Sequence, residues 1–180
     1  YDSVSTNPLW REASWAFRES EDEELIGLWA KVLGVKYLFV NEDESDEYYK
    51  DYKNEYILKR HFNVVDKFWG GYLIAFDNTN LAWEIVNGYY KTKTKKFDPM
   101  NLKSSLEDYL GFRGKALPVI LKNSSFLIET KGSSKVLLLM NYFSGYEIKN
   151  EKGENLSYLR DPFGHIIIDA DDAKEVIVGF

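Results

Sequence analysis

The last third of the chain alternates short apolar runs with residues that favour turns. The runs lie at 136–140, 166–168 and 176–178, and Gly, Asn and Asp residues separate them. Short β-branched and aromatic runs bounded in this way are typical of strands joined by consecutive hairpins. We therefore predict a C-terminal antiparallel β-sandwich, jelly-roll-like in architecture. Its strands are expected near residues 117–122, 125–130, 135–143, 146–150, 155–160, 164–169 and 174–180.

Helical periodicity occurs at two places before this region. Ser20 and Glu23 have the spacing of a capping box, and apolar residues then recur at one-face helical spacing until Gly34. This pattern predicts a helix near 21–33. A second apolar stripe follows an Asp-Pro pair, which is a common helix start, and predicts a helix near 99–110.

The segments around these helices are predicted to be strands and loops. Residues 35–40 form an aliphatic and aromatic run, two further runs flank Gly70-Gly71, and 81–86 leads into an Asn-Gly pair typical of a hairpin. Residues 1–19 are expected to be an irregular or extended lead-in that packs by its aromatic side chains. The lysine-rich stretch 91–96 is expected to be a solvated strand or loop.

Together these elements predict an α+β fold. We expect an N-terminal α/β part, residues 1–115, and the C-terminal sandwich, residues 116–180, to pack as one compact unit. The 180 residues are enough to bury a hydrophobic core. Hydrophobic residues make up 44% of the chain and aromatic residues 16%, which favours a β-rich folded protein over a disordered one.

Charge and composition narrow the function classes. A formal net charge of -6 disfavours nucleic acid as a partner, because neutralising phosphates requires clustered Lys and Arg. The chain has no Cys, so disulfides and thiolate chemistry are excluded. No apolar run reaches the roughly 18–20 residues that cross a bilayer. The sequence begins at Tyr1 without a signal peptide, and we interpret it as a piece of a longer protein.

Two segments resemble one known family. Residues 33–40, LGVKYLFV, resemble the segment that opens a soluble domain in YfhO-like and pyruvoyl-tetrahydropterin-synthase-related membrane proteins of bacteria and archaea. Residues 137–146, LLLMNYFSGY, resemble the signature of the same family, which ends in Pro-Gly-Trp. This chain has Ser144 where the family has Pro, and Tyr146 where it has Trp.

The resemblance implies a location and a role. Members of this family are similar in layout to glycosyltransferases of lipid-linked sugars, and their soluble domain lies outside the cytoplasmic membrane. We therefore expect this chain to lie on the extracytoplasmic side of the cell membrane. Its expected partners are the membrane-embedded part of its own parent chain and a glycan or lipid-linked sugar. The chain alone is expected to be non-catalytic, and the parent protein to be glycosyltransferase-like.

Four aromatic residues are the candidate ligand-binding residues: Tyr142, Phe143, Tyr146 and Trp69. Sugar sites use flat aromatic faces beside polar groups, and Tyr and Trp combine an apolar ring with a polar atom. The alternative is that strand alternation buries Tyr142 and Tyr146 as packing at a corner of the sandwich. A contiguous exposed aromatic patch would favour the binding interpretation.

The ionisable residues do not form a recognisable catalytic or metal motif. The two histidines, His61 and His165, lack any metal-binding spacing and are expected at the surface or at a strand edge. Asp161 and the acidic turn 169–172 offer oxygen ligands for calcium, but a polar hairpin turn is the favoured interpretation of that turn. We therefore expect no catalytic residue, no cofactor and no metal ligand.

An independent carbohydrate-binding or adhesion module is the alternative function. Asp161-Pro162-Phe163-Gly164 resembles a turn in type II secretion pseudopilins, which would make the chain an assembly module. Asn123 and Asn155 each begin a tripeptide with the form of a glycosylation site, and such tripeptides are also frequent by chance.

Overall fold

The computed structural model describes residues 8–43, 45, 52–77, 79–86 and 99–179. They form an α+β fold, as predicted, and the chain divides into two compact units, Tyr1–Thr79 and Asn80–Phe180. The Asn87-Gly88 hairpin signal and the stretch 91–96 lie outside the described residues.

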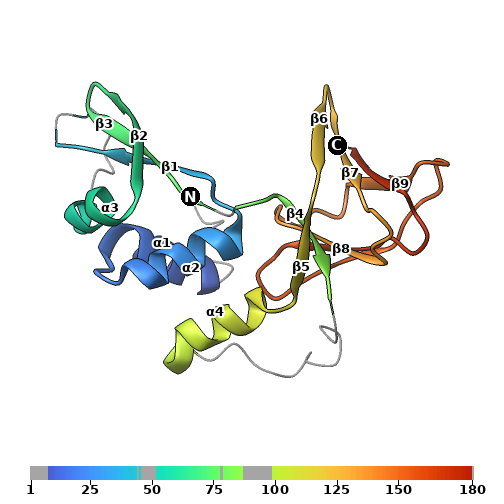
Figure 1. The fold of residues 1–180 in the computed structure, drawn as a ribbon, viewed down its shortest axis with the longest axis horizontal. Coiled ribbons are helices and arrows are strands. Elements are labelled where there is room, and N and C mark those ends of the chain that lie inside the picture. Colours follow the sequence, from blue (N-terminus) through green and yellow to red (C-terminus); the bar gives the residue numbers. More distant parts are fainter. Residues whose placement is uncertain (1–7, 44, 46–51, 78, 87–98, 180) are drawn as a thin grey trace. The chain divides into compact units, whose positions relative to one another are not determined.

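The N-terminal unit packs three helices against a small antiparallel sheet (Figure 1). The strand order is β1-β3-β2, and the register pairs Val40 with Tyr72 and Leu38 with Ile74. Val40, Tyr72 and Ile74 share one face of the sheet and are fully buried, whereas Phe39 points to the other face and is exposed. The elements are α1 (Pro8–Glu19), α2 (Glu23–Leu33), β1 (Tyr37–Asn41), α3 (Glu55–His61), β2 (Asn63–Phe68) and β3 (Gly71–Ala75).

Helix α2 occurs where the sequence predicts a helix, but its first turn is capped by a different residue. The N-cap is Asp22, whose carboxylate accepts a hydrogen bond from the Leu25 amide at 3.1 Å, and the Ser20 hydroxyl accepts one from the Asp22 amide. The capping box predicted at Ser20 is therefore wrong by two residues. Gly34 ends the helix in the left-handed conformation, as predicted, with φ of 67°.

Two helices of this unit were not predicted. Residues 8–19 form α1 instead of an extended lead-in, because Ala13, Ala16 and Phe17 recur at helical spacing and are buried, whereas Trp15 is exposed. Helix α3 lies at the start of residues 54–76, which were predicted to form the two strands on either side of Gly70-Gly71. It is only seven residues long, too short for its two buried residues, Ile57 and Leu58, to reveal a helical period.

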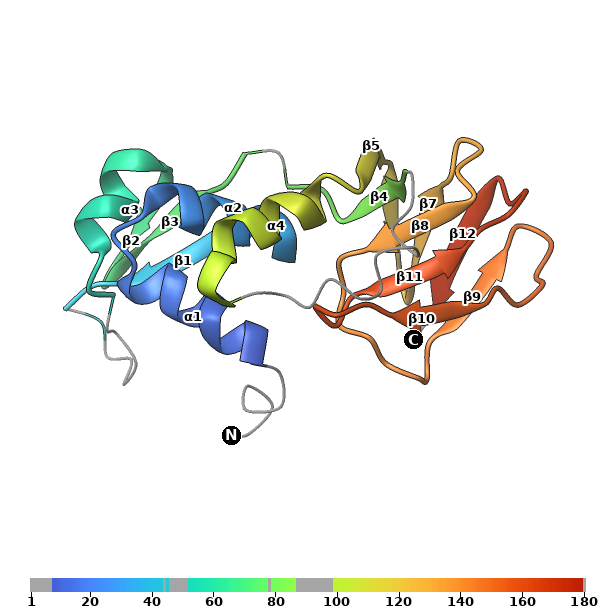
Figure 2. The same cartoon turned by 90° about the horizontal axis from the view of Figure 1, so that it is seen from below.

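The C-terminal unit is a sandwich of two antiparallel sheets, which lie in separate layers in Figure 2. One has the strand order β10-β11-β8-β4-β5 and the other β6-β7-β12-β9. The elements are β4 (Ala82–Ile85), the 3-10 helix η2 (Pro99–Asn101), α4 (Leu102–Leu110), β5 (Arg113–Leu117), β6 (Val119–Lys122), β7 (Ser125–Glu129), β8 (Lys135–Leu138), β9 (Glu147–Asn150), β10 (Tyr158–Arg160), β11 (Ile166–Asp169) and β12 (Glu175–Gly179).

Both sheets contribute to one hydrophobic core. Leu138 and Ile166 are cross-strand partners in the first sheet, Ile128 and Val176 are partners in the second, and all four are fully buried. Their side chains belong to a single cluster of buried residues that also includes Ala82 of β4. Burial of this shared core on two sheet faces is what holds the sandwich together.

The boundary between the parts and the order of the strands differ from expectation. Strand β4 hydrogen-bonds with β8 and with β5, so the sandwich begins near Asn80 and not at residue 116, and the chain forms two compact units. The predicted consecutive hairpins are also mostly wrong. Within the described part of 116–179, β6-β7 and β10-β11 are sequence neighbours that pair, whereas the other connections pass from one sheet to the other.

Candidate functional site

Three of the four candidate ligand residues lie in one loop of the sandwich. We define the aromatic loop as residues 139–146, which connect β8 to β9. Phe143 is 61% exposed and Tyr142 is 36% exposed. Tyr146 is partly buried and packs against the sandwich core. The corner-packing alternative therefore describes Tyr146, and the exposed rings are those of Tyr142 and Phe143.

Tyr158 on β10 supports the aromatic loop by hydrogen bonds to its backbone. Its hydroxyl lies 3.1 Å from the carbonyl oxygens of both Ser144 and Tyr146, so it donates to this pair of acceptors. Its ring contacts the Tyr142 ring, with centroids 5.7 Å apart. Phe143 in turn packs edge-on against Tyr146, with centroids 5.6 Å apart. The rings are thus held in place by one another and by a side-chain hydrogen bond.

Gly145 leaves room for the Phe143 ring. A Cβ atom at position 145 would collide with the edge of that ring. Any other residue at this position would push the Phe143 ring aside, because the ring is the movable partner in this contact. The orientation of the most exposed ring of the loop therefore depends on glycine.

A tight turn, residues 161–165, supports the other end of the aromatic loop. The Tyr142 amide donates to the Gly164 carbonyl at 2.7 Å. The turn itself is closed by Asp161, whose Oδ1 accepts hydrogen bonds from the Phe163 amide at 2.8 Å and the His165 amide at 2.7 Å. An Asp side chain that bonds to the backbone two and four residues later is a common way to fix a turn.

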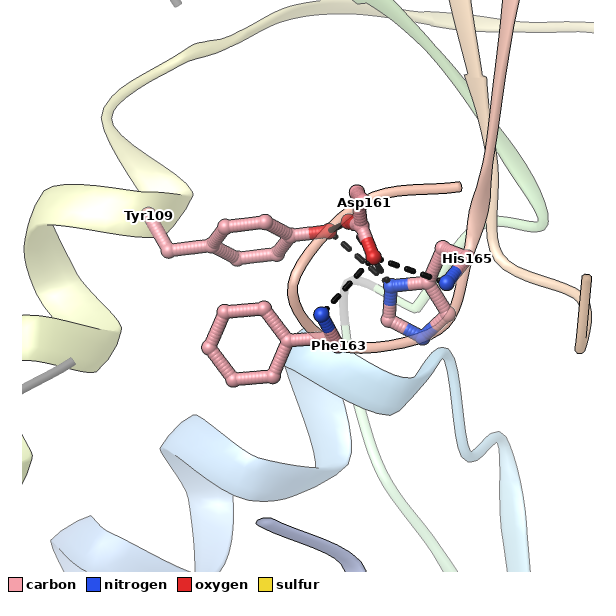
Figure 3. Close-up of polar contacts among 4 residues, drawn as sticks. All are labelled: Tyr109, Asp161, Phe163 and His165. Atoms are coloured by element: carbon pink, nitrogen blue, oxygen red, sulfur yellow. Dashed lines mark hydrogen bonds and ion pairs between the residues drawn. The ribbon is translucent and has the colours of Figure 1, made fainter. Parts of the chain in front are cut away.

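The turn is connected to helix α4 by a group of buried polar side chains, which we call the buried network: Tyr109, Asp161 and His165 (Figure 3). The Tyr109 hydroxyl donates to Asp161 Oδ2 at 2.6 Å and lies 2.9 Å from His165 Nδ1. Asp161 is 4% exposed and His165 is 2% exposed. The Phe163 ring packs against the Tyr109 ring, with centroids 4.3 Å apart, and encloses the network.

The number of available protons fixes the hydrogen-bond directions in the buried network. Burial raises the pKa of the Asp161 carboxyl, but hydrogen bonds from His165 and Tyr109 outweigh burial, and the pKa is lowered overall. Asp161 is therefore ionised and only accepts. The single Tyr109 hydroxyl proton goes to Asp161, so the Tyr109 oxygen accepts from His165 and Nδ1 carries a proton.

The buried network is suited to holding structure and not to acting on a substrate. Its three side chains are the types used in general acid–base catalysis, but all are at most 5% exposed. Arg113 of β5 adds a positive charge over the Tyr109 ring, 5.3 Å from its centroid, and also lies over Trp83. Among the candidate ligand residues of this unit, the rings of Tyr142 and Phe143 remain accessible to a ligand.

The remaining candidate residues lie elsewhere. Trp69 is 77% exposed and belongs to the N-terminal unit, whereas the aromatic loop belongs to the C-terminal unit, so the chain does not bring all four candidates into one compact unit. His61 is exposed, as predicted, 3.8 Å from Glu23. The prediction that His165 lies at the surface is wrong, because the turn that follows Asp161 folds it into the buried network.

The acidic turn 169–172 forms a polar turn between β11 and β12. These strands lie in different sheets, so the turn is not a hairpin. Asp169 pairs with Lys135 and accepts a hydrogen bond from Ser157 at 2.8 Å, and the bond from Lys135 is the main reason that the pKa of Asp169 is lowered. In the part of the chain that the structure describes, no group of three or more His, Asp or Glu residues is arranged to hold a metal ion.

Tyr109, Asp161 and His165 were not predicted to act together. The Asp161 turn was visible as a sequence pattern, and Tyr109 lies on the predicted apolar face of its helix. Their contact joins residues that are 52 positions apart, and nothing in the spacing of a single sequence reports such a pairing. The one local signal that could have found the pairing is a His shortly after the Asp161-Pro162-Phe163-Gly164 turn.

No family model, curated protein or solved structure matches the chain. Among the described residues, no helix combines the length and the hydropathy needed to cross a membrane.

Proposed function

We propose that this chain is a non-catalytic, extracytoplasmic part of a membrane glycosyltransferase-like protein, and that its aromatic loop contacts a glycan or a lipid-linked sugar. The observation that carries the proposal is the exposure of Tyr142 and Phe143 on a loop whose backbone is held at both ends. Exposed aromatic rings that are already ordered bind at a lower entropic cost than flexible ones. A pyranose ring presents an apolar C–H face that suits such rings, and its hydroxyls suit the carbonyls nearby.

The position of the loop in the sequence supports the link to a membrane protein. Residues 137–146 are the segment that resembles the signature of the YfhO-like family, and they include both exposed rings. Asp161 and His165, the acid–base residues of the turn that supports this loop, are buried. We therefore assign contact with the sugar to this chain and the transfer chemistry to the membrane-embedded part of the parent protein.

An independent carbohydrate-binding or adhesion module is the second candidate. It is favoured by the division into two compact units, because the C-terminal unit has a hydrophobic core of its own. The two candidates differ in the full-length gene. A row of membrane-spanning segments beside residues 1–180 supports the first, and a gene without them supports the second.

A glycan-array screen of the 180-residue chain tests the binding. We expect Phe143→Ala to reduce binding roughly two- to tenfold, since an aromatic ring contact contributes about 0.5–1.5 kcal/mol. Gly145→Ala, which displaces the Phe143 ring, is expected to weaken binding in the same direction. Leu121→Ala is the matched control, because Leu121 is 72% exposed on β6 and lies outside the aromatic loop.

Three results would contradict the proposal. The first is equal binding by Phe143→Ala and Leu121→Ala, and the second is no binding by the unmodified chain. The third is hydrolysis or transfer of a sugar by the 180-residue chain alone, which would place catalysis in this chain.

A further inference from the structure

We infer that the buried network positions the aromatic loop, so that Tyr109 and Asp161 control sugar binding without touching the sugar. The inference rests on the proposed function for the identity of the ligand, but the ordering of the loop by the buried network does not depend on that function. Three contacts in series carry it, and each lies within the C-terminal unit.

The first contact fixes the turn to helix α4. Asp161 Oδ2 accepts from the Tyr109 hydroxyl at 2.6 Å, a short distance that is typical of an O–H bond to an ionised carboxylate. His165 Nδ1 lies 3.4 Å from the same Asp161 oxygen and 2.9 Å from the Tyr109 oxygen. Each of the three groups contacts the other two, so loss of the Tyr109 hydroxyl removes a partner from both Asp161 and His165.

The second contact holds the turn in shape. The other carboxylate oxygen of Asp161 accepts from the amides of Phe163 and His165. The Gly164 amide also donates to the Asp161 carbonyl at 3.1 Å. The same side chain therefore determines both where the turn is attached and how its backbone is oriented, including the Gly164 carbonyl.

The third contact joins the turn to the aromatic loop. The Gly164 carbonyl accepts from the Tyr142 amide at 2.7 Å, so the residue with the second most exposed ring of the loop is bonded directly to the turn. Tyr158 holds the following part of the loop through Ser144 and Tyr146. Of the two supports, only the one at Tyr142 depends on the buried network.

This arrangement predicts that a buried substitution at Tyr109 weakens sugar binding. Tyr109 is 5% exposed, so it has no surface to offer a sugar, yet removing its hydroxyl loosens Tyr142. Affinity then falls through the loss of order in the loop and not through the loss of a ligand contact. Tyr109 and Asp161 are thus positioning residues for the binding that Tyr142 and Phe143 carry out.

Amide hydrogen exchange on the 180-residue chain tests the inference without any sugar. In Tyr109→Phe, which keeps the ring and its packing on Phe163, we expect the Tyr142 amide to exchange roughly tenfold faster, the factor that corresponds to one lost buried hydrogen bond. The amides of β12, in the other sheet, are expected to gain less in rate than the Tyr142 amide, because they exchange when the whole unit unfolds. Asp161→Asn provides a second variant with the same expected direction. Glycan affinity of Tyr109→Phe is expected to fall by a similar factor.

The outcomes separate the inference from the proposed function. An unchanged exchange rate of the Tyr142 amide in a folded Tyr109→Phe chain overturns the inference. Equal loss of protection at Tyr142 and at β12, or unfolding of both variants, also overturns it, because the network would then stabilise the whole unit. Faster exchange at Tyr142 in a chain that binds no glycan upholds the positioning role and refutes the proposed function instead.

Discussion

Asp161 shows how a single side chain connects chemistry to conformation in this protein. Its carboxylate accepts three hydrogen bonds, from Tyr109 and from two backbone amides, while 4% exposed. A buried charge is tolerated only when its acceptor sites are filled in this way. The residue could be recognised in the sequence as part of a turn, but its buried partner on α4 could not, because burial is a property of the assembled unit.

The lowered pKa of Asp161 predicts acid sensitivity of the C-terminal unit. Because the folded pKa lies below the unfolded value of about 3.9, the ionised carboxylate stabilises the fold above that value. The contribution is lost as the pH falls through the folded pKa. We expect Asp161→Asn to lower the unfolding free energy by roughly 1.5–3 kcal/mol at neutral pH, the range for hydrogen bonds to charged groups.

Urea unfolding of both chains at a series of pH values measures this effect. The difference in unfolding free energy between the wild type and Asp161→Asn is expected to shrink as the pH falls below about 3.9, the usual pKa of an Asp side chain. Asp171→Asn, in the exposed acidic turn, serves as the control. A difference that stays constant down to the acid limit would show that the charge of Asp161 does not stabilise the fold.

The strands of the sandwich were predicted better than their connections. The apolar runs at β8, β11 and β12 lie within the predicted strands, because each run contributes buried side chains to the shared core. The pairing of the strands was mostly mispredicted. A turn such as 170–174 looks the same whether the next strand returns to the same sheet or crosses to the other, since the distinction depends on which face the later residues bury.

Removal of side-chain volume from the shared core tests the sandwich arrangement. Leu138 on β8 is fully buried, so Leu138→Ala is expected to lower the unfolding free energy by about 2–5 kcal/mol. Leu121→Ala on the exposed part of β6 is expected to change it by less than about 0.5 kcal/mol. Denaturant unfolding of the two variants measures the contrast, and similar losses in both would mean that the core does not lie where the sheets meet.

The chain as a whole divides into two compact units, and the sandwich core lies in the second. The boundary was predicted between residues 115 and 116, yet β4 precedes it, β5 (Arg113–Leu117) spans it, and both belong to the sandwich. The boundary was misplaced because helix α4 lies between these two strands in the sequence and gives this stretch a mixed α/β pattern. The α+β class itself followed correctly from the periodicities.

Expression of residues 80–180 alone tests the division. We expect a β-rich circular dichroism spectrum and a single cooperative unfolding transition, because the sandwich core contains no residue of the N-terminal unit. A spectrum without β structure, or a gradual loss of signal on heating, would show that the sandwich requires residues 1–79.

The contact between the glycan and the chain can be located by nuclear magnetic resonance. The isotope-labelled 180-residue chain is titrated with a glycan that binds on the array. Ligand contact at the aromatic loop predicts that the largest amide shifts fall at residues 142–146, with smaller ones at 158 and 164, where the loop is supported. Shifts centred on Trp69 or on β6, with residues 142–146 unchanged, would contradict a sugar site at this loop.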